Sequence, residues 1–122
     1  MTLVLVALGA VVGAPLRYLV DRFIQARHDT IFPWGTLAVN VAGSLILGFL
    51  AGAAAAGRLN PVIFTVLGPG FCGALTTYST FGYETLRLAE EGSRFLASAN
   101  IAMNLLAGLG AAFIGFTSAA AL

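Results

Sequence analysis

GPGFCGALTTYSTFGYE, from Gly68 to Glu84, is the stretch that decides how this chain can fold. It holds four glycines, one proline and a run of five hydroxyl side chains at positions 76 to 80, yet it lies within an otherwise apolar segment. Backbone that leaves a helix inside a bilayer loses its internal hydrogen bonds, so it is tolerated only where protein or a polar cavity replaces them. The stretch therefore predicts a broken membrane helix that lines a site.

The rest of the chain is apolar enough to surround such a helix with others. Only 9% of its 122 residues are charged and its mean hydropathy is +0.95, which places it outside the soluble class. A membrane helix needs roughly 20 apolar residues. Four spans meet this need, the first by continuing past Arg17 to Val20: Met1 to Leu16, Ile31 to Gly57, Asn60 to Tyr83 and Phe95 to Leu122. We predict an all-α membrane protein, one domain of residues 1–122, with four transmembrane helices and a break in the third.

The first helix is predicted from about Thr2 to Ile24, followed by a charged connection from Asp21 to Pro33. We expect the cell to retain this helix, because it has no basic start and no small-x-small cleavage site of a signal peptide. Gly9 and Gly13 are spaced by four residues, which lets a second helix approach closely. They predict a packing face.

Polar side chains recur at helical spacing on the second and fourth spans. Thr36, Asn40 and Ser44 share one face of the second helix, and Asn100 and Asn104 share one face of the fourth. An asparagine in hydrocarbon must find a hydrogen-bond partner. Asn40 is therefore either part of a functional site or one half of a structural bond between helices, and its spacing alone leaves both open.

The charges favour one orientation in the membrane without deciding it. Glu84 is followed after three residues by Arg87, and we interpret the two as an ion pair at a helix end. The first and third connections hold four arginines, against Arg58 alone in the second, which favours both termini outside. Because so few arginines decide the matter, insertion in both orientations stays open.

Several classes of function lack the residues that they need. A net charge of +1 excludes a strongly basic surface for nucleic acid. One histidine and one cysteine leave almost nothing from which to build a zinc or iron site. Catalysis needs a titratable pair within hydrogen-bond reach, which Glu84 and Arg87 do not supply, so we predict that the protein is not an enzyme.

What remains on the last three helices is hydroxyls, amides and ring edges, which can solvate a small anion. Four helices enclose little lumen, so we expect a pore between subunits.

The order of these motifs resembles that of the Fluc (CrcB) family of fluoride channels over nearly the full length. The third helix carries the most specific part, close to the family's GFCGxxTTFSTFxxE. The matching residues are Gly13, Ala14, Arg17 and Tyr18; GTLAVN at 35–40 with Gly43 and Ser44; and GFCG at 70–73 with TTYSTF at 76–81 and Glu84.

The resemblance implies an antiparallel dimer in the cell's inner (cytoplasmic) membrane. Two pores would run along its interfaces and let fluoride leave the cytoplasm passively, which reduces fluoride toxicity. A structural sodium ion would lie at the centre, held by the backbone carbonyls of Gly73 and Thr76. Carbonyls freed at a helix break suit that ion.

The resemblance also assigns the residues of each pore. The family's pair of pore phenylalanines corresponds to Tyr78 and Phe81, its pore asparagine to Asn40 and the polar mouth on the second helix to Thr36. The same path would contain Ser79, Thr80 and Glu84, with a polar track at Asn100 and Asn104.

Two departures from the family pattern keep alternatives open. Tyr78 stands where the family usually has phenylalanine, and Asn100 and Asn104 stand where it often has a tyrosine and a serine. Two arrangements therefore stay open. The chain forms a homodimer, or it forms a heterodimer with an oppositely oriented paralogue and is the non-conducting or half-degenerate subunit of that pair. The remaining alternative belongs to another class of function, that of the proton-coupled small multidrug exporters. Such an exporter would need a carboxylate deep in a helix.

Overall fold

The computed structural model describes residues 2–27, 32–76 and 79–122, which form helices joined by short connections. The helices are α1 (Thr2–Ala26), α2 (Trp34–Ala55), α3 (Pro61–Thr65), the π-helix η1 (Val66–Cys72), α4 (Gly73–Leu75), α5 (Ser79–Glu90) and α6 (Arg94–Ala121). Four segments of 25, 22, 30 and 28 residues are long and apolar enough to cross a membrane. The predicted all-helical fold with four spans is confirmed.

The third span changes its helical geometry along its length. Asn60 begins it by accepting a hydrogen bond from the Val62 amide at 2.7 Å, with Pro61 in the first turn. Pro69 lies inside η1, and the wider π turn accommodates a residue that has no N–H to donate. α4 ends at Leu75, and Thr76 has extended backbone with φ −80° and ψ 161°. Helix resumes at Ser79, and residues 77 and 78 of the predicted break lie outside the described residues.

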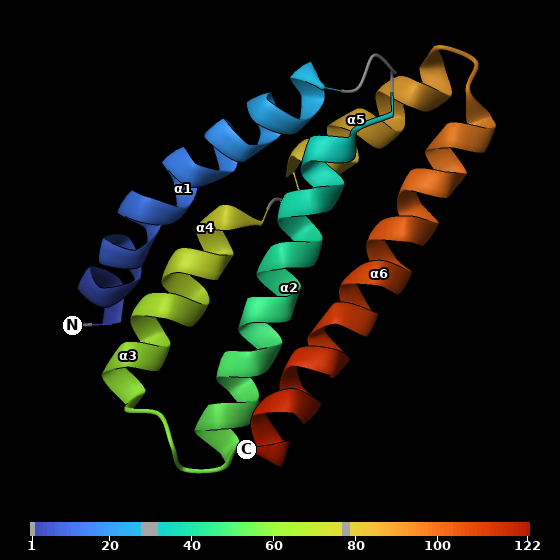
Figure 1. Cartoon of the computed structure of the whole chain (residues 1–122). Coiled ribbons are helices and arrows are strands. Elements are labelled where there is room, and N and C mark those ends of the chain that lie inside the picture. Colours follow the sequence, from blue (N-terminus) through green and yellow to red (C-terminus); the bar gives the residue numbers. More distant parts are fainter. Residues whose placement is uncertain (1, 28–31, 77–78) are drawn as a thin grey trace.

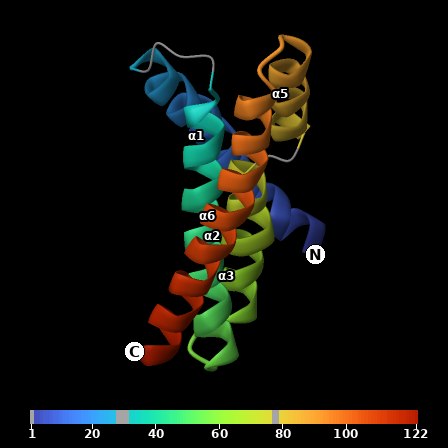
Figure 2. The same ribbon diagram turned by 90° about the vertical axis from the view of Figure 1, so that its right-hand side faces the viewer.

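The helices lie side by side, so that each packs mainly on its neighbours. Figure 1 shows α1 at one side, then the column of α3 and α4, then α2, and α6 at the other side. α1 packs on η1, and α2 packs most extensively on α6. Figure 2 shows that α5 leaves the direction of α3 and α4 and lies beside the first turns of α6, against which it packs. α2 is therefore the central helix of the fold.

Glycines set how closely neighbouring helices approach. A Cβ on Gly70 of η1 would lie 3.1 Å from the Cα of Gly9 on α1, so the two backbones touch. Gly9 and Gly13 are both buried, which confirms the packing face predicted on the first helix. Across the other interface, a Cβ on Gly115 of α6 would lie 2.7 Å from the Phe49 nitrogen of α2. At both contacts the facing helix leaves no space for a side chain, so only glycine fits.

Two predicted boundaries and one predicted ion pair are wrong. α1 continues to Ala26, so Asp21 lies within the helix instead of beginning the connection. α5 continues to Glu90, past Tyr83, where the third span was predicted to end. The salt bridge of Arg87 is made to Glu91 at 3.1 Å instead of to Glu84. Helical spacing brings both Glu84 and Glu91 within reach of Arg87. Packing decides between them, because the Glu84 side chain lies against Thr36 of α2.

We predict that Gly115→Ala lowers the free energy of unfolding by about 1–3 kcal/mol, the usual cost of an overpacked contact. The new methyl group would meet backbone, which cannot move aside. The matched control is Gly110→Ala on the same helix, where an added Cβ meets nothing within 4 Å. Equilibrium unfolding in mixed detergent micelles measures both, and equal stability of the two variants would contradict the close α2–α6 contact.

Candidate functional site

The polar stripes of α2 and α6 meet in a chain of side-chain amides. Asn40 Nδ2 donates a hydrogen bond to Asn104 Oδ1 at 2.9 Å, across the helix interface. Asn104 Nδ2 in turn donates to two oxygens of Asn100, the backbone carbonyl at 2.8 Å and Oδ1 at 2.9 Å. Three of the candidate residues chosen from sequence therefore form one connected set, each supplying a partner for the next.

The chain of amides continues onto α5 through a residue that the sequence analysis missed. Asn100 is fully buried, and its Nδ2 donates to Thr85 Oγ1 at 2.8 Å. The Thr85 hydroxyl donates to the backbone carbonyl of Phe81 at 2.8 Å. We call Asn40, Asn104, Asn100 and Thr85 the amide ladder. The signal for Thr85 was its position four residues after Phe81, which places it on the same helical face.

A cavity of about 290 Å³ lies against the Asn40 end of the ladder. Its walls combine two ladder amides, a threonine next to the end of α4, the Phe81 side chain and small or aliphatic residues. The lining residues are Asn40, Gly43, Ser44, Leu47, Thr76, Phe81, Asn104 and Leu105. Ser44 can offer a hydroxyl hydrogen to an anion and Phe81 the positive edge of its ring, whereas both hydrogens of the Asn104 amide are donated to Asn100. The apolar part of the wall displaces water. The chemistry of this cavity suits a small anion.

One helical turn away, Thr36 lies beside a second group of candidate residues. Thr36 is 2% exposed and shares a cavity of about 180 Å³ with Arg17 and Thr80. Its side chain lies next to that of Glu84. Glu84 Oε1 is buried without a hydrogen-bond partner among the described residues. Glu84 also lines a neighbouring cavity of about 270 Å³ together with charged side chains, so the polar surface extends from Thr36 toward the charged end of α5.

The remaining candidates lie at the end of α4 and the start of α5. Thr76 Oγ1 donates to the Cys72 carbonyl at 3.0 Å, and Thr76 lines the cavity beside Asn40. Gly73 is exposed in α4, and a Cβ there would meet nothing within 4 Å. Ser79 begins α5, whereas Tyr78 lies outside the described residues.

The end of α4 presents backbone carbonyls and the hydroxyl of Thr76, and the described residues place no cluster of the usual metal-binding side chains there. Within residues 2–27, 32–76 and 79–122 no three His, Cys, Asp or Glu side chains gather to hold a metal ion. The last carbonyls of α4, including that of Gly73, lie at the C-terminal end of a helix, where cations are favoured. Carbonyl oxygens are hard donors and fit an alkali cation.

Comparison with known proteins gives close relatives over nearly the whole chain. The family described as "CrcB-like protein, Camphor Resistance (CrcB)" matches residues 4–116. A relative named Fluoride-specific ion channel FluC 1 in Streptomyces avermitilis is 60% identical over 122 residues, covering 100% of this chain and 98% of that one. The FluC 1 of Frankia casuarinae is 58% identical over 94% of this chain and 93% of its own. The FluC of Shewanella loihica is 42% identical over 93% and 91%.

We predict that Asn100→Leu lowers the free energy of unfolding by about 1–3 kcal/mol, since the Asn104 amide and the Thr85 hydroxyl each lose a partner. Ser98→Leu, on an exposed position of the same helix, introduces the same side chain as a control. Unfolding in mixed micelles compares the two. If Asn100→Leu is as stable as the control, the ladder does not hold α5 and α6 together.

Proposed function

The chain belongs to the CrcB family, and on that basis we propose that it is a channel that lets fluoride leave the cytoplasm passively. The observation that carries the proposal is that Asn40, Asn104 and Phe81 line the same cavity. Relatives named fluoride-specific ion channels cover this chain almost completely, and the four long apolar helices suit a multi-pass protein of the cell membrane. Neither the family nor the site calls for an enzyme.

The cavity offers a dehydrated anion what water would otherwise supply. Removing a small anion from water is costly unless hydrogen bonds replace its hydration shell. We place Thr36, Thr80 and Glu84 toward one mouth of the path, since Thr36 shares a cavity with Thr80 and lies next to the Glu84 side chain. Asn40 and Phe81 follow further in. The same path includes Tyr78, Ser79, Asn100 and Asn104.

We infer that two chains assemble in antiparallel fashion with a pore at each interface. α1 and α6 support this inference, because only 11% of their most apolar windows is buried within one chain. Such faces need lipid or a second subunit. The partner is another copy or an oppositely oriented paralogue. Two of the relatives carry the number 1 in their names, which is in keeping with paralogues in those organisms.

We also propose that a sodium ion binds to the backbone carbonyls of Gly73 and Thr76. The end of α4 at Leu75 and the extended backbone of Thr76 support the assignment, because both turn carbonyls away from regular helical bonding. When bound between two subunits, the ion would supply the positive charge that holds two helix ends against each other. Gly73 leaves open space beside its backbone, as close approach of an ion or a partner requires.

The test uses liposomes loaded with fluoride, with release followed by a fluoride electrode. The wild-type chain, expressed alone, should release fluoride. Phe81→Ile should reduce the rate by at least about tenfold, the effect of a barrier raised by about 1.4 kcal/mol when a ring edge is lost. Recovery of the dimer on size-exclusion chromatography should be unchanged.

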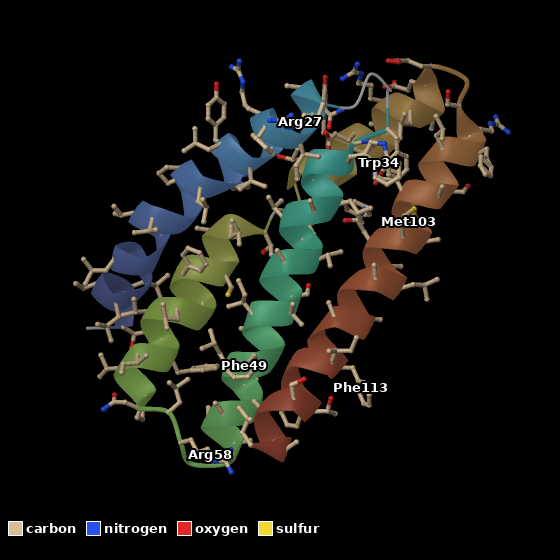
Figure 3. The ribbon with its side chains drawn as sticks, viewed as in Figure 1. Arg27, Trp34, Phe49, Arg58, Met103 and Phe113 are labelled. Carbon is tan, nitrogen blue, oxygen red and sulfur yellow. The ribbon has the colours of Figure 1, made fainter. Side chains whose placement is uncertain are left out.

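Phe113→Ile is the matched control for that substitution. Phe113 is 70% exposed and points away from α2 on the outer side of α6 (Figure 3). Phe113 lines none of the three cavities described above, so the Phe113→Ile variant should conduct like the wild type as long as its dimer is recovered in full. Two results would overturn the proposal: a wild-type chain that releases no fluoride, or Phe81→Ile conducting normally while its dimer dissociates.

A further inference from the structure

The first turn of α2 takes one of its hydrogen bonds from another helix. α2 begins at Trp34, and Pro33 before it makes no capping hydrogen bond with its side chain. The Trp34 amide donates to the Phe32 carbonyl at 2.9 Å, and the Leu37 amide donates to the Pro33 carbonyl at 3.2 Å. Gly35 lies between them and is buried, so its amide needs an acceptor from outside the helix.

Gln25 of α1 supplies that acceptor. The Gly35 amide donates to Gln25 Oε1 at 3.2 Å, and Gln25 Nε2 donates to the Phe32 carbonyl at 3.3 Å. The oxygen and nitrogen of an amide have nearly the same shape, so its partners fix the orientation. Here the partners are a backbone N–H, which can only donate, and a carbonyl, which can only accept. One side chain therefore holds both the segment before α2 and its first turn.

Asp21 faces the same turn of α2 from one turn earlier on α1. A Cβ on Gly35 would lie 2.9 Å from the Asp21 Cα, so the two helices touch as closely as glycine allows. Asp21 and Gln25 are four residues apart and share one face of α1, and both line the cavity that contains Glu84. A carboxylate beside the start of a helix is favourable. This face of α1 therefore seats the first turn of α2.

The residue that follows Gly35 is Thr36, at the proposed mouth of the anion path. Thr36 is 2% exposed, shares a cavity with Arg17 and Thr80, and lies next to the Glu84 side chain. A buried amide that loses its acceptor is costly, and the turn that carries it unwinds to reach water. Unwinding of this turn would take Thr36 away from the other residues of the mouth.

We propose that Gln25 is a positioning residue for the mouth of the anion path. It caps the Gly35 amide from α1, and the capped turn holds Thr36 between Arg17 of α1 and Thr80 of α5. Gln25 acts on the path through the backbone of α2. The inference rests on the proposed fluoride channel and deepens it.

The main variant is Gln25→Met, which keeps the length of the side chain and its neutral charge but removes both hydrogen bonds. The Gly35 amide should exchange its hydrogen about tenfold faster, the factor that one hydrogen bond of ordinary net strength represents. NMR of the deuterium-exchanged protein in micelles measures this rate. Gln25→Asn, whose amide is one methylene shorter, serves if the methionine variant does not fold.

Fluoride release from liposomes by Gln25→Met should fall by about threefold or more. Helix ends open at little cost in free energy, so a turn that loses a factor of ten in its closing equilibrium is open for most of the time. Recovery of the dimer should be unchanged. The control is Ala26→Met, which introduces the same side chain at the next, exposed position of α1. It should exchange and conduct like the wild type.

Two further variants separate positioning from packing. Gln25→Glu keeps an oxygen for the Gly35 amide, so the slow exchange of that amide should return. In the Thr36→Val background, Gln25→Met should cause little further loss of flux, because residues that act as one unit are not additive.

Unchanged exchange of the Gly35 amide in Gln25→Met would overturn the inference, since Gln25 would then not be the cap. Normal flux in that variant, or losses of flux that add up in the double variant with Thr36→Val, would overturn it as well. A wild type without fluoride flux defeats the proposed function instead, and the exchange of the Gly35 amide still decides whether Gln25 caps α2.

Discussion

An amide among apolar helices has to be hydrogen-bonded, and in this protein the buried Asn100 and the half-buried Asn104 and Asn40 belong to one chain of hydrogen bonds. The bond from Asn40 to Asn104 joins α2 to α6, and the bond from Asn100 to Thr85 joins α6 to α5. α5 packs mainly on α6 and follows the extended backbone at Thr76, so few other contacts hold it. The amide ladder therefore places the helix that carries Phe81 relative to the one that carries Asn40. The cavity between them depends on that placement.

Close helix packing is what makes such short polar bonds possible. Gly48 and Gly115 let the backbones of α2 and α6 touch, as the 2.8 Å from a Cβ on Gly48 to Ala112 indicates. A larger residue would separate the helices and lengthen the 2.9 Å bond between Asn40 and Asn104. On the other side of α2, the π turn at Pro69 and the contact of Gly70 with α1 bring Thr76 to the same cavity. Small residues thus govern the geometry of the site as well as its stability.

Much of this arrangement could be predicted from the sequence, because membrane helices leave clear periodic signals. Hydropathy gives the four spans, and the four-residue spacing of asparagines on two helices indicates that their polar faces need partners. The partner of Arg87 could not be predicted, since Glu84 and Glu91 both lie within one turn of it and packing decides between them. Thr85 was missed because a threonine in a helix usually bonds its own backbone; that it also accepts from Asn100 depends on the tertiary approach of α6.

In the proposed channel, hydroxyls, amide hydrogens and ring edges form a path that prefers fluoride to other small anions. The most direct test is the reversal potential of the wild-type protein in a planar bilayer, with fluoride on one side and chloride on the other. We expect a potential that approaches the equilibrium potential of fluoride and does not respond to the chloride concentration. A reversal potential that follows chloride, or one near zero that shows equal permeability to both ions, would contradict it.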